Sequence, residues 1–105
     1  MLLKEKIMLV TGAASGIGRA IAVTAAREGA TVVVSDLDEA GAAETLARVR
    51  EARGDGALVV ADVARASDAR RLVDRAVSKY GRLDIACNNA GVGGELAPTA
   101  EYPDE

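Results

Sequence analysis

The chain has 105 residues, enough for one domain, and 50% of them are hydrophobic although tyrosine, present twice, is its only aromatic residue type. The net charge of −3 and the scattered basic residues argue against a nucleic-acid partner, while the absence of histidine and the single Cys87 exclude a His/Cys metal cluster and an internal disulfide. Residues 1–6 are too short and charged for a signal peptide, and no apolar run approaches the roughly 18 residues of a membrane span. We therefore expect a cytoplasmic protein without metal or membrane partners and with an aliphatic core.

Four short apolar runs alternate with three segments of helical periodicity along the chain. The runs cover residues 7–11, 31–35, 57–61 and 83–88, and the helical segments cover residues 16–28, 38–53 and 67–80. The runs are nearly continuously apolar, which is typical of parallel strands that helices cover on both faces. The order β-α-β-α-β-α-β predicts an α/β fold, a Rossmann-type doubly wound parallel sheet that is incomplete at four strands. Glu44 and Arg48 are spaced to form an i,i+4 ion pair on the second helix.

The first apolar run ends in the sequence Thr11-Gly-Ala-Ala-Ser-Gly-Ile-Gly18, directly before a helical segment. Glycines at these positions let the backbone approach a diphosphate, and the free N–H groups at the start of the helix point at the same place. A P-loop is excluded because Arg19-Ala20 follows Gly18 instead of Lys-Ser/Thr. The turn therefore predicts a dinucleotide site, with a turn needed only for tight strand–helix packing as the alternative.

Asp36 closes the second apolar run, where a carboxylate can accept hydrogen bonds from the hydroxyls of an adenosine ribose. The same carboxylate repels a 2′-phosphate by roughly 4 kcal/mol per unit-charge pair at about 4 Å and an effective dielectric constant near 20. Neither Ser15 nor Leu37 supplies a compensating positive charge, so we expect NAD in preference to NADP. The alternative for Asp36 is a cap for the helix at residue 38. We expect Arg19 to be an exposed helix arginine, with a phosphate contact as the less favoured reading.

Two further polar turns follow the third and fourth runs, at the carboxyl edge of the sheet where open α/β folds bind ligands. Asp62-Val63 follows the third run, although an acidic residue is also common in an ordinary strand-to-helix loop. Asn88-Asn89-Ala90-Gly91 ends the fourth run, and its amides can join strand ends to one another or leave backbone groups facing a ligand. The hydroxyl of Thr11 can bond across its own glycine turn or toward this second turn.

These motifs, in this order, resemble the amino-terminal half of the short-chain dehydrogenase/reductase family, and the resemblance covers nearly the whole chain. It implies an oxidoreductase that transfers hydride between a nicotinamide cofactor and an alcohol or carbonyl substrate. It also implies that Asp62 and the backbone beside it contact the adenine, and that the Asn-Asn-Ala-Gly turn borders the nicotinamide ribose. The cofactor-binding residues that the resemblance indicates are Thr11, Gly12, Ser15, Gly16, Ile17, Gly18, Asp36, Leu37, Asp62, Val63, Asn89, Ala90 and Gly91.

The family's catalytic tyrosine, with a lysine four residues later, has no counterpart among the 105 residues. Tyr80 is followed four residues later by Asp84, and Tyr102 has no fourth successor. We assign no catalytic residue and expect residues 1–105 to be one dinucleotide-binding domain, truncated relative to a complete enzyme. Residues 92–105 are predicted to form a loop and the start of a further helix. The alternatives are a nucleotide-binding half-domain without catalysis and a self-assembling piece, because residues 83–88 would form an exposed edge strand that favours a homo-oligomer.

Overall fold

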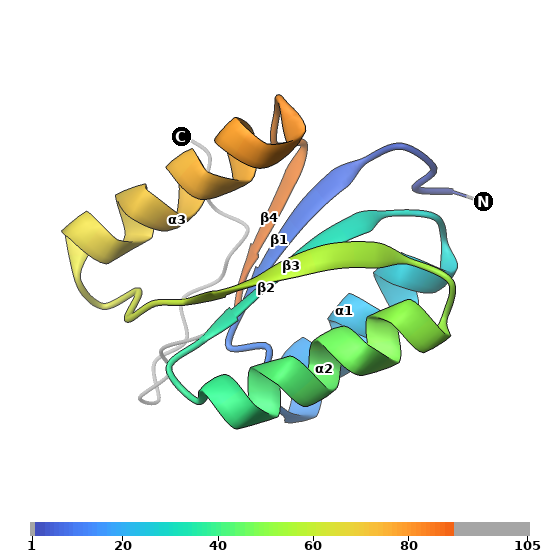
Figure 1. Ribbon diagram of the computed structural model, residues 1–105, viewed down its shortest axis with the longest axis horizontal. Coiled ribbons are helices and arrows are strands. Elements are labelled where there is room, and N and C mark those ends of the chain that lie inside the picture. The colour runs from blue at the N-terminus through green and yellow to red at the C-terminus, as the bar shows by residue number, and fades with distance from the viewer. Residues whose placement is uncertain (1, 90–105) are drawn as a thin grey trace.

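The structure is a computed structural model that describes residues 2–89, and its strands and helices alternate along the chain (Figure 1). The elements are β1 (Ile7–Thr11), α1 (Gly16–Arg27), β2 (Thr31–Asp36), α2 (Glu39–Glu51), β3 (Asp55–Val60), α3 (Ala66–Tyr80) and β4 (Ile85–Asn88). The predicted number, type and order of elements are confirmed. The loop and helix start predicted for residues 92–105 lie outside the described residues.

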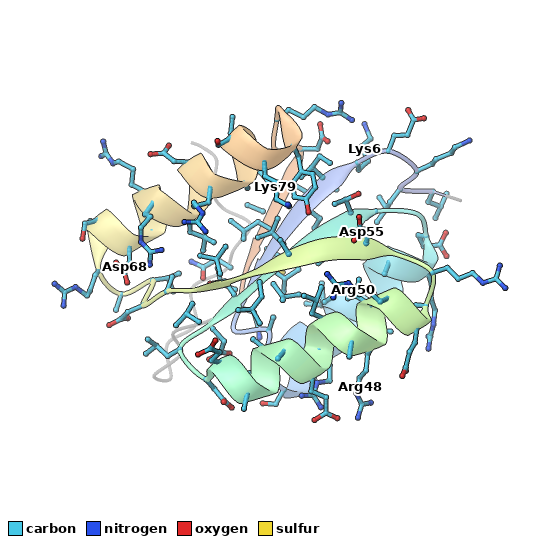
Figure 2. All side chains as sticks on the ribbon, in the orientation of Figure 1. Lys6, Arg48, Arg50, Asp55, Asp68 and Lys79 are labelled. Carbon is cyan, nitrogen blue, oxygen red and sulfur yellow. The ribbon has the colours of Figure 1, made fainter. Side chains whose placement is uncertain are left out.

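Four predicted element starts are wrong by one or two residues. The second helix begins at Glu39 rather than at residue 38, and the fourth strand begins at Ile85 rather than at residue 83. The third strand begins at Asp55 rather than at residue 57, and the third helix begins at Ala66 rather than at Ser67. Arg65 is the N-cap residue of this helix and makes no side-chain capping bond, whereas Asp68, within the first turn, accepts a hydrogen bond from the backbone N–H of Asp62 at 2.9 Å. Figure 2 shows Asp68 at this end of α3. The contact fixes the loop that leads out of β3.

The four strands form one parallel sheet in the order β3-β2-β1-β4. The register places Thr11 of β1 beside Ser35 of β2 on one side and beside Asn88 of β4 on the other. Helices α1 and α2 cover one face of the sheet and α3 lies on the opposite face (Figure 1). The predicted doubly wound arrangement is therefore confirmed, and the carboxyl ends of all four strands meet at one edge.

The core is aliphatic, as expected, and consists of one cluster on each face of the sheet. Successive residues of β1 and β2 alternate between the clusters, because neighbouring side chains of a strand point to opposite faces. Met8, Val10, Val32 and Val34 pack toward α1 and α2, whereas Leu9 and Val33 pack with Leu72 and Ala76 of α3. Every residue of β1 is buried. The two central strands therefore hold the carboxyl edge of the sheet rigidly.

Strand β4 departs from the expectation that every strand is covered on both faces. Ile85 and Cys87 are half-buried against the α1–α2 side, whereas Ala86 and Asn88 are exposed. Within residues 2–89 this strand pairs only with β1, and α3 leaves Val73 and Val77 40% and 41% exposed. Cys87, which its apolar run predicts to be a small core residue, is partly buried and packs against the core cluster on the α1–α2 side, and this burial raises the pKa of the thiol.

Polar contacts outside the core follow the sequence pattern. Arg48 donates a hydrogen bond to Glu44 at 2.7 Å, which confirms the predicted i,i+4 pair, and its side chain projects away from the sheet (Figure 2). Among residues 2–89, no helix combines the length and apolar character needed to cross a bilayer. The same part of the chain contains no group of three or more His, Cys, Asp or Glu side chains that could hold a metal ion.

Candidate functional site

A cavity of about 400 Å³ opens at the carboxyl edge of the sheet, where the sequence places its polar turns. Its walls are Thr11, Gly12, Ser35, Asp36, Leu37, Ala61, Asp62, Val63, Ala64 and Asn89. Most of the predicted site residues therefore meet in one place, although they come from four separate turns. Another depression lies between α1 and α2 and begins at Gly16 of the glycine turn, and a further one lies along α3. The cavity at the strand ends is the candidate functional site.

The glycines of the first turn are required for different physical reasons. Gly12 and Gly16 have positive φ angles of 65° and 58°, a conformation that is costly for residues with a side chain. An ideal Cβ on Gly18, in the first turn of α1, would lie 2.0 Å from the carbonyl oxygen of Gly12. Gly18 is therefore needed for close backbone contact, and the three glycines together give the turn its shape.

The backbone N–H groups of this turn fall into two sets. The N–H of Ala13 donates to the carbonyl oxygen of Ser35 at 3.1 Å, and the N–H of Ala14 donates to a carboxylate oxygen of Asp36 at 3.0 Å. Within the described part of the chain, the N–H groups of residues 15–18 have no acceptor. They are the free donors expected at the start of a helix, and they can bind an anion. Ser15, the N-cap residue, makes no side-chain capping bond and is exposed.

Asp36 lies at the end of β2 and holds the glycine turn against this strand. Besides the N–H of Ala14, its carboxylate accepts the N–H of Asp38 at 3.0 Å. The helix cap proposed as the alternative for Asp36 is in fact Asp38, which accepts the N–H of Gly41 at 3.0 Å. Each carboxylate oxygen of Asp36 retains a second lone pair, so it can still accept a hydrogen bond from a ligand hydroxyl. Leu37, 64% exposed, lies beside it at the rim of the cavity.

Asp62 and Val63 form the wall that follows β3. One carboxylate oxygen of Asp62 accepts the N–H of Ala64 at 3.0 Å, which closes a tight turn. Arg71 of α3 donates to the carbonyl oxygen of Val60 at 2.9 Å and ties the helix to the end of the strand. Half-buried Val63 also contacts the cluster beneath α3. The Asp62-Val63 turn is thus fixed on both sides and faces the same cavity as Asp36.

Thr11 connects the glycine turn with the end of β4. Its hydroxyl donates to the side-chain oxygen of Asn88 at 2.8 Å and accepts the backbone N–H of Asn89 at 3.0 Å. The side-chain amide of Asn89 also donates to the carbonyl oxygen of Gly12 at 3.4 Å. The bond toward the Asn-Asn turn, one of the two alternatives for Thr11, is therefore formed. Asn88 and Asn89 join strand ends, as one of the two predicted roles requires, and Ala90 and Gly91 lie outside the described residues.

The expectation for Arg19 is wrong, because its side chain is only 22% exposed and donates to the carbonyl oxygen of Ala14 at 2.5 Å. The sequence reasoning also missed Thr45, a fully buried polar residue of α2, and Ser35, whose buried hydroxyl has no hydrogen-bond partner within the described residues. A threonine directly before Leu46 on the buried side of a helix was the available signal for Thr45. Ile17, predicted from the motif, is 70% exposed at the start of α1.

Comparison with known proteins places this site in a family. Residues 6–105 match the short chain dehydrogenase family. The chain is 46% identical over 101 residues to a 3beta-hydroxysteroid dehydrogenase of Mediterraneibacter gnavus, covering 96% of this chain and 37% of the relative. It is 40% identical over 97 residues to a cyclohexanol dehydrogenase of Acinetobacter sp. (strain SE19), covering 92% of this chain and 39% of that relative.

Solved structures agree with the sequence relatives. The crystal structure of a hydroxysteroid dehydrogenase from Escherichia coli matches with a TM-score of 0.83 and 37% identity, covering 95% of this chain and 42% of that one. A short chain dehydrogenase from Mycobacterium smegmatis matches with a TM-score of 0.82 and 44% identity, covering 89% and 40%. The chain thus spans about two fifths of the length of these proteins. With its fold, its glycine turn and these relatives in agreement, the chain belongs to the short-chain dehydrogenase/reductase family.

Proposed function

We propose that the chain binds NAD and forms the nucleotide-binding half of an oxidoreductase that acts on an alcohol or carbonyl compound. The observation that carries the proposal is that the free N–H groups of residues 15–18 and the carboxylate of Asp36 meet at one edge of the sheet. Donors at a helix start suit a diphosphate, and an acceptor one strand away suits a ribose diol. Membership of the family supports a dinucleotide cofactor.

The arrangement of the described residues along this edge of the sheet supports a bound dinucleotide. Residues 12 and 15–18 would hold the diphosphate, because two positive-φ glycines keep side chains away from the free N–H groups. Asp62 and Val63 would hold the adenine, with Leu37 at the rim covering it, since this wall offers one acceptor and apolar surface. Thr11 and Asn89, with Ala90 and Gly91, would border the nicotinamide ribose. When bound, the cofactor supplies or accepts the hydride.

The preference for NAD over NADP rests on the charge around Asp36. Among residues 2–89, no arginine or lysine lines the cavity, so none of these residues offsets the repulsion between this carboxylate and a 2′-phosphate. Arg19, the basic residue nearest along the chain to the glycine turn, is bonded to Ala14 and Thr45 instead. A dinucleotide with a free ribose diol is therefore the better match.

The alcohol or carbonyl substrate is proposed from the relatives, which are named as hydroxysteroid and cyclohexanol dehydrogenases. Nothing in residues 1–105 supplies a Tyr-x-x-x-Lys pair to exchange a proton with such a substrate. The second candidate function is a nucleotide-binding half-domain without catalysis, which the same free N–H groups of residues 15–18 and the carboxylate of Asp36 support. For either candidate we propose a cytoplasmic homo-oligomer, in which a second copy covers the exposed edge of β4.

Calorimetric titration of the chain with NAD and with NADP tests the proposal. We expect NAD to bind at least about tenfold more tightly than NADP, since roughly 1.4 kcal/mol of discrimination suffices for this ratio. Asp36→Asn should weaken NAD binding and bring the affinities for NAD and NADP closer together. The substitution removes the charge while keeping an oxygen that can accept the N–H of Ala14. The matched control is Asp38→Asn, which retains helix capping and should leave the ratio unchanged. Equal affinity of the unsubstituted chain for both dinucleotides would refute the role of Asp36.

A further inference from the structure

The carbonyl groups of Ala13 and Ala14, in the middle of the glycine turn, are both held by side chains of the helices. The hydroxyl of Thr45 in α2 donates to the carbonyl oxygen of Ala13 at 2.6 Å. The guanidinium of Arg19 in α1 donates to the carbonyl oxygen of Ala14 at 2.5 Å. The N–H groups of the same two alanines are bonded to Ser35 and Asp36. All four backbone polar groups of this dipeptide are therefore fixed within the protein.

Arg19 and Thr45 also act on each other. The Nε of Arg19 donates to the Oγ1 of Thr45 at 2.9 Å, so the hydroxyl proton of Thr45 points elsewhere. It has two acceptors within reach, the carbonyl oxygens of Ala13 at 2.6 Å and of Gly41 at 3.2 Å, and the shorter bond is the stronger. The Nη2 group of Arg19 donates hydrogen bonds to the carbonyl oxygens of Ala14 and Gly41. A continuous series of hydrogen bonds therefore links Arg19 through Thr45 to the turn.

The start of α2 lies unusually close to the turn, which makes this chain of bonds possible. An ideal Cβ on Gly41 would lie 2.8 Å from the Cβ of Ala14 and 2.6 Å from a carboxylate oxygen of Asp38. Thr45 is 0% exposed, and only 22% of the Arg19 side chain is exposed, so water competes weakly for these bonds. Buried bonds of this kind are costly to break, because each leaves an unpaired carbonyl.

We propose that Arg19 and Thr45 are positioning residues that fix the glycine turn so that the N–H groups of residues 15–18 are held ready for a diphosphate. The inference rests on the proposed function and adds two residues to it. Neither side chain needs to touch the ligand: the Nε and Nη2 groups of Arg19 and the hydroxyl of Thr45 are all committed to the protein. A turn that is ordered before binding loses less entropy when the ligand arrives.

The test compares a ligand with a diphosphate, ADP, with one that lacks it, adenosine, by NMR titration of the full chain. The variants are Arg19→Met and Thr45→Val, which keep side-chain volume but remove the donors. The matched control is Arg27→Met, in the same helix at an exposed position. We expect ADP affinity to fall about tenfold in both variants, as loss of a buried hydrogen bond predicts, with adenosine affinity unchanged. Thr45→Ser, which restores the hydroxyl, should recover ADP binding.

Two results would overturn the inference. A parallel loss of ADP and adenosine affinity would mean that the substitutions only unfold the domain. A loss with Arg19→Met and none with Thr45→Val would mean that Arg19 contacts the phosphates itself. The double variant provides a further check, since two residues that act as one chain should lose little more together than each loses alone.

Failure of the proposed function can be recognised separately. If the unsubstituted chain binds neither ADP nor adenosine, the nucleotide site is refuted, and the positioning role is judged on the ligand-free protein. The ¹H–¹⁵N signals of residues 13–18 should then shift in Arg19→Met and Thr45→Val but not in Arg27→Met. Unchanged signals would refute the role of Arg19 and Thr45 in ordering the turn.

Discussion

Gly12 and Gly18 are in direct backbone contact: an ideal Cβ on Gly18 would lie 2.0 Å from the carbonyl oxygen of Gly12 and 3.0 Å from the side-chain nitrogen of Asn89. Gly16 differs, since a Cβ there would meet nothing within 4 Å but its φ of 58° disfavours any side chain. Gly18 is therefore required because a side chain has no room there, and Gly16 is required because of its backbone conformation.

This difference predicts unequal costs for two similar substitutions. Gly18→Ala should destabilise the chain by about 3 kcal/mol, because the collision is with backbone and outweighs the gain in helix propensity. Gly16→Ala should cost only about 1 kcal/mol, the penalty of a left-handed conformation. Urea denaturation followed by circular dichroism measures both. Equal midpoints for the two variants would contradict the steric role of Gly18.

The hydrogen bonds of Asp84, next to β4, predict how the stability of the fold depends on pH. Its carboxylate accepts the N–H of Ile7 at 2.8 Å and a bond from Arg82 at 2.9 Å, and these bonds lower the pKa of Asp84. A lowered folded-state pKa stabilises the fold above the unfolded-state pKa, near about 3.9, and this contribution is lost as pH falls toward the folded-state value. Asp84→Asn should therefore lose stability at pH 6 and show a flatter decline below pH 4. Parallel curves for the two proteins, measured by urea denaturation, would be inconsistent with this role.

The chain alone should have no dehydrogenase activity, because none of its tyrosines is followed by a lysine four residues later. Oxidation of NADH with a panel of cyclic and linear ketones should proceed at the rate without protein. A complete relative from the family, assayed in parallel, serves as the positive control. Turnover by the purified chain would show that its own residues suffice for proton exchange.

The exposed edge of β4 predicts self-association. Within residues 2–89 the outer edge of β4 has no strand partner, and this edge, together with exposed Ala86, Val73 and Val77, offers a surface for a second strand or helix. Light scattering from about 1 to 100 µM should show species larger than a monomer. Ala86→Lys, a charged substitution on this edge, should shift the distribution toward the monomer. A cooperatively folding monomer at all concentrations would instead favour an independent binding module.

The fold was predictable because strands buried in a parallel sheet give continuous apolar runs, and each helix here ends close to a glycine. Asp36 and the Asn88-Asn89 pair could be placed in the site because the carboxyl ends of parallel strands share an edge. The contacts of Arg19 could not be predicted, since they depend on how close α2 lies to the turn. The half-burial of Cys87 likewise depends on which neighbours β4 has, and an apolar run does not carry that information.

The bond between Ile7 and Asp84 joins residues 77 positions apart, whereas β1 and β2 are joined through one intervening helix. Closing a longer loop costs more chain entropy, so we expect β1 and β2 to pair early in folding and β4 to be added late. The Thr11–Asn88 bond would then form after the glycine turn is already in place. Pulse-labelling hydrogen exchange should find β1 and β2 protected before β4, and the reverse order would contradict this sequence of events. The glycine turn and Asp36, proposed to hold the diphosphate and a ribose, would thus be in place during folding before Thr11 is joined to the end of β4.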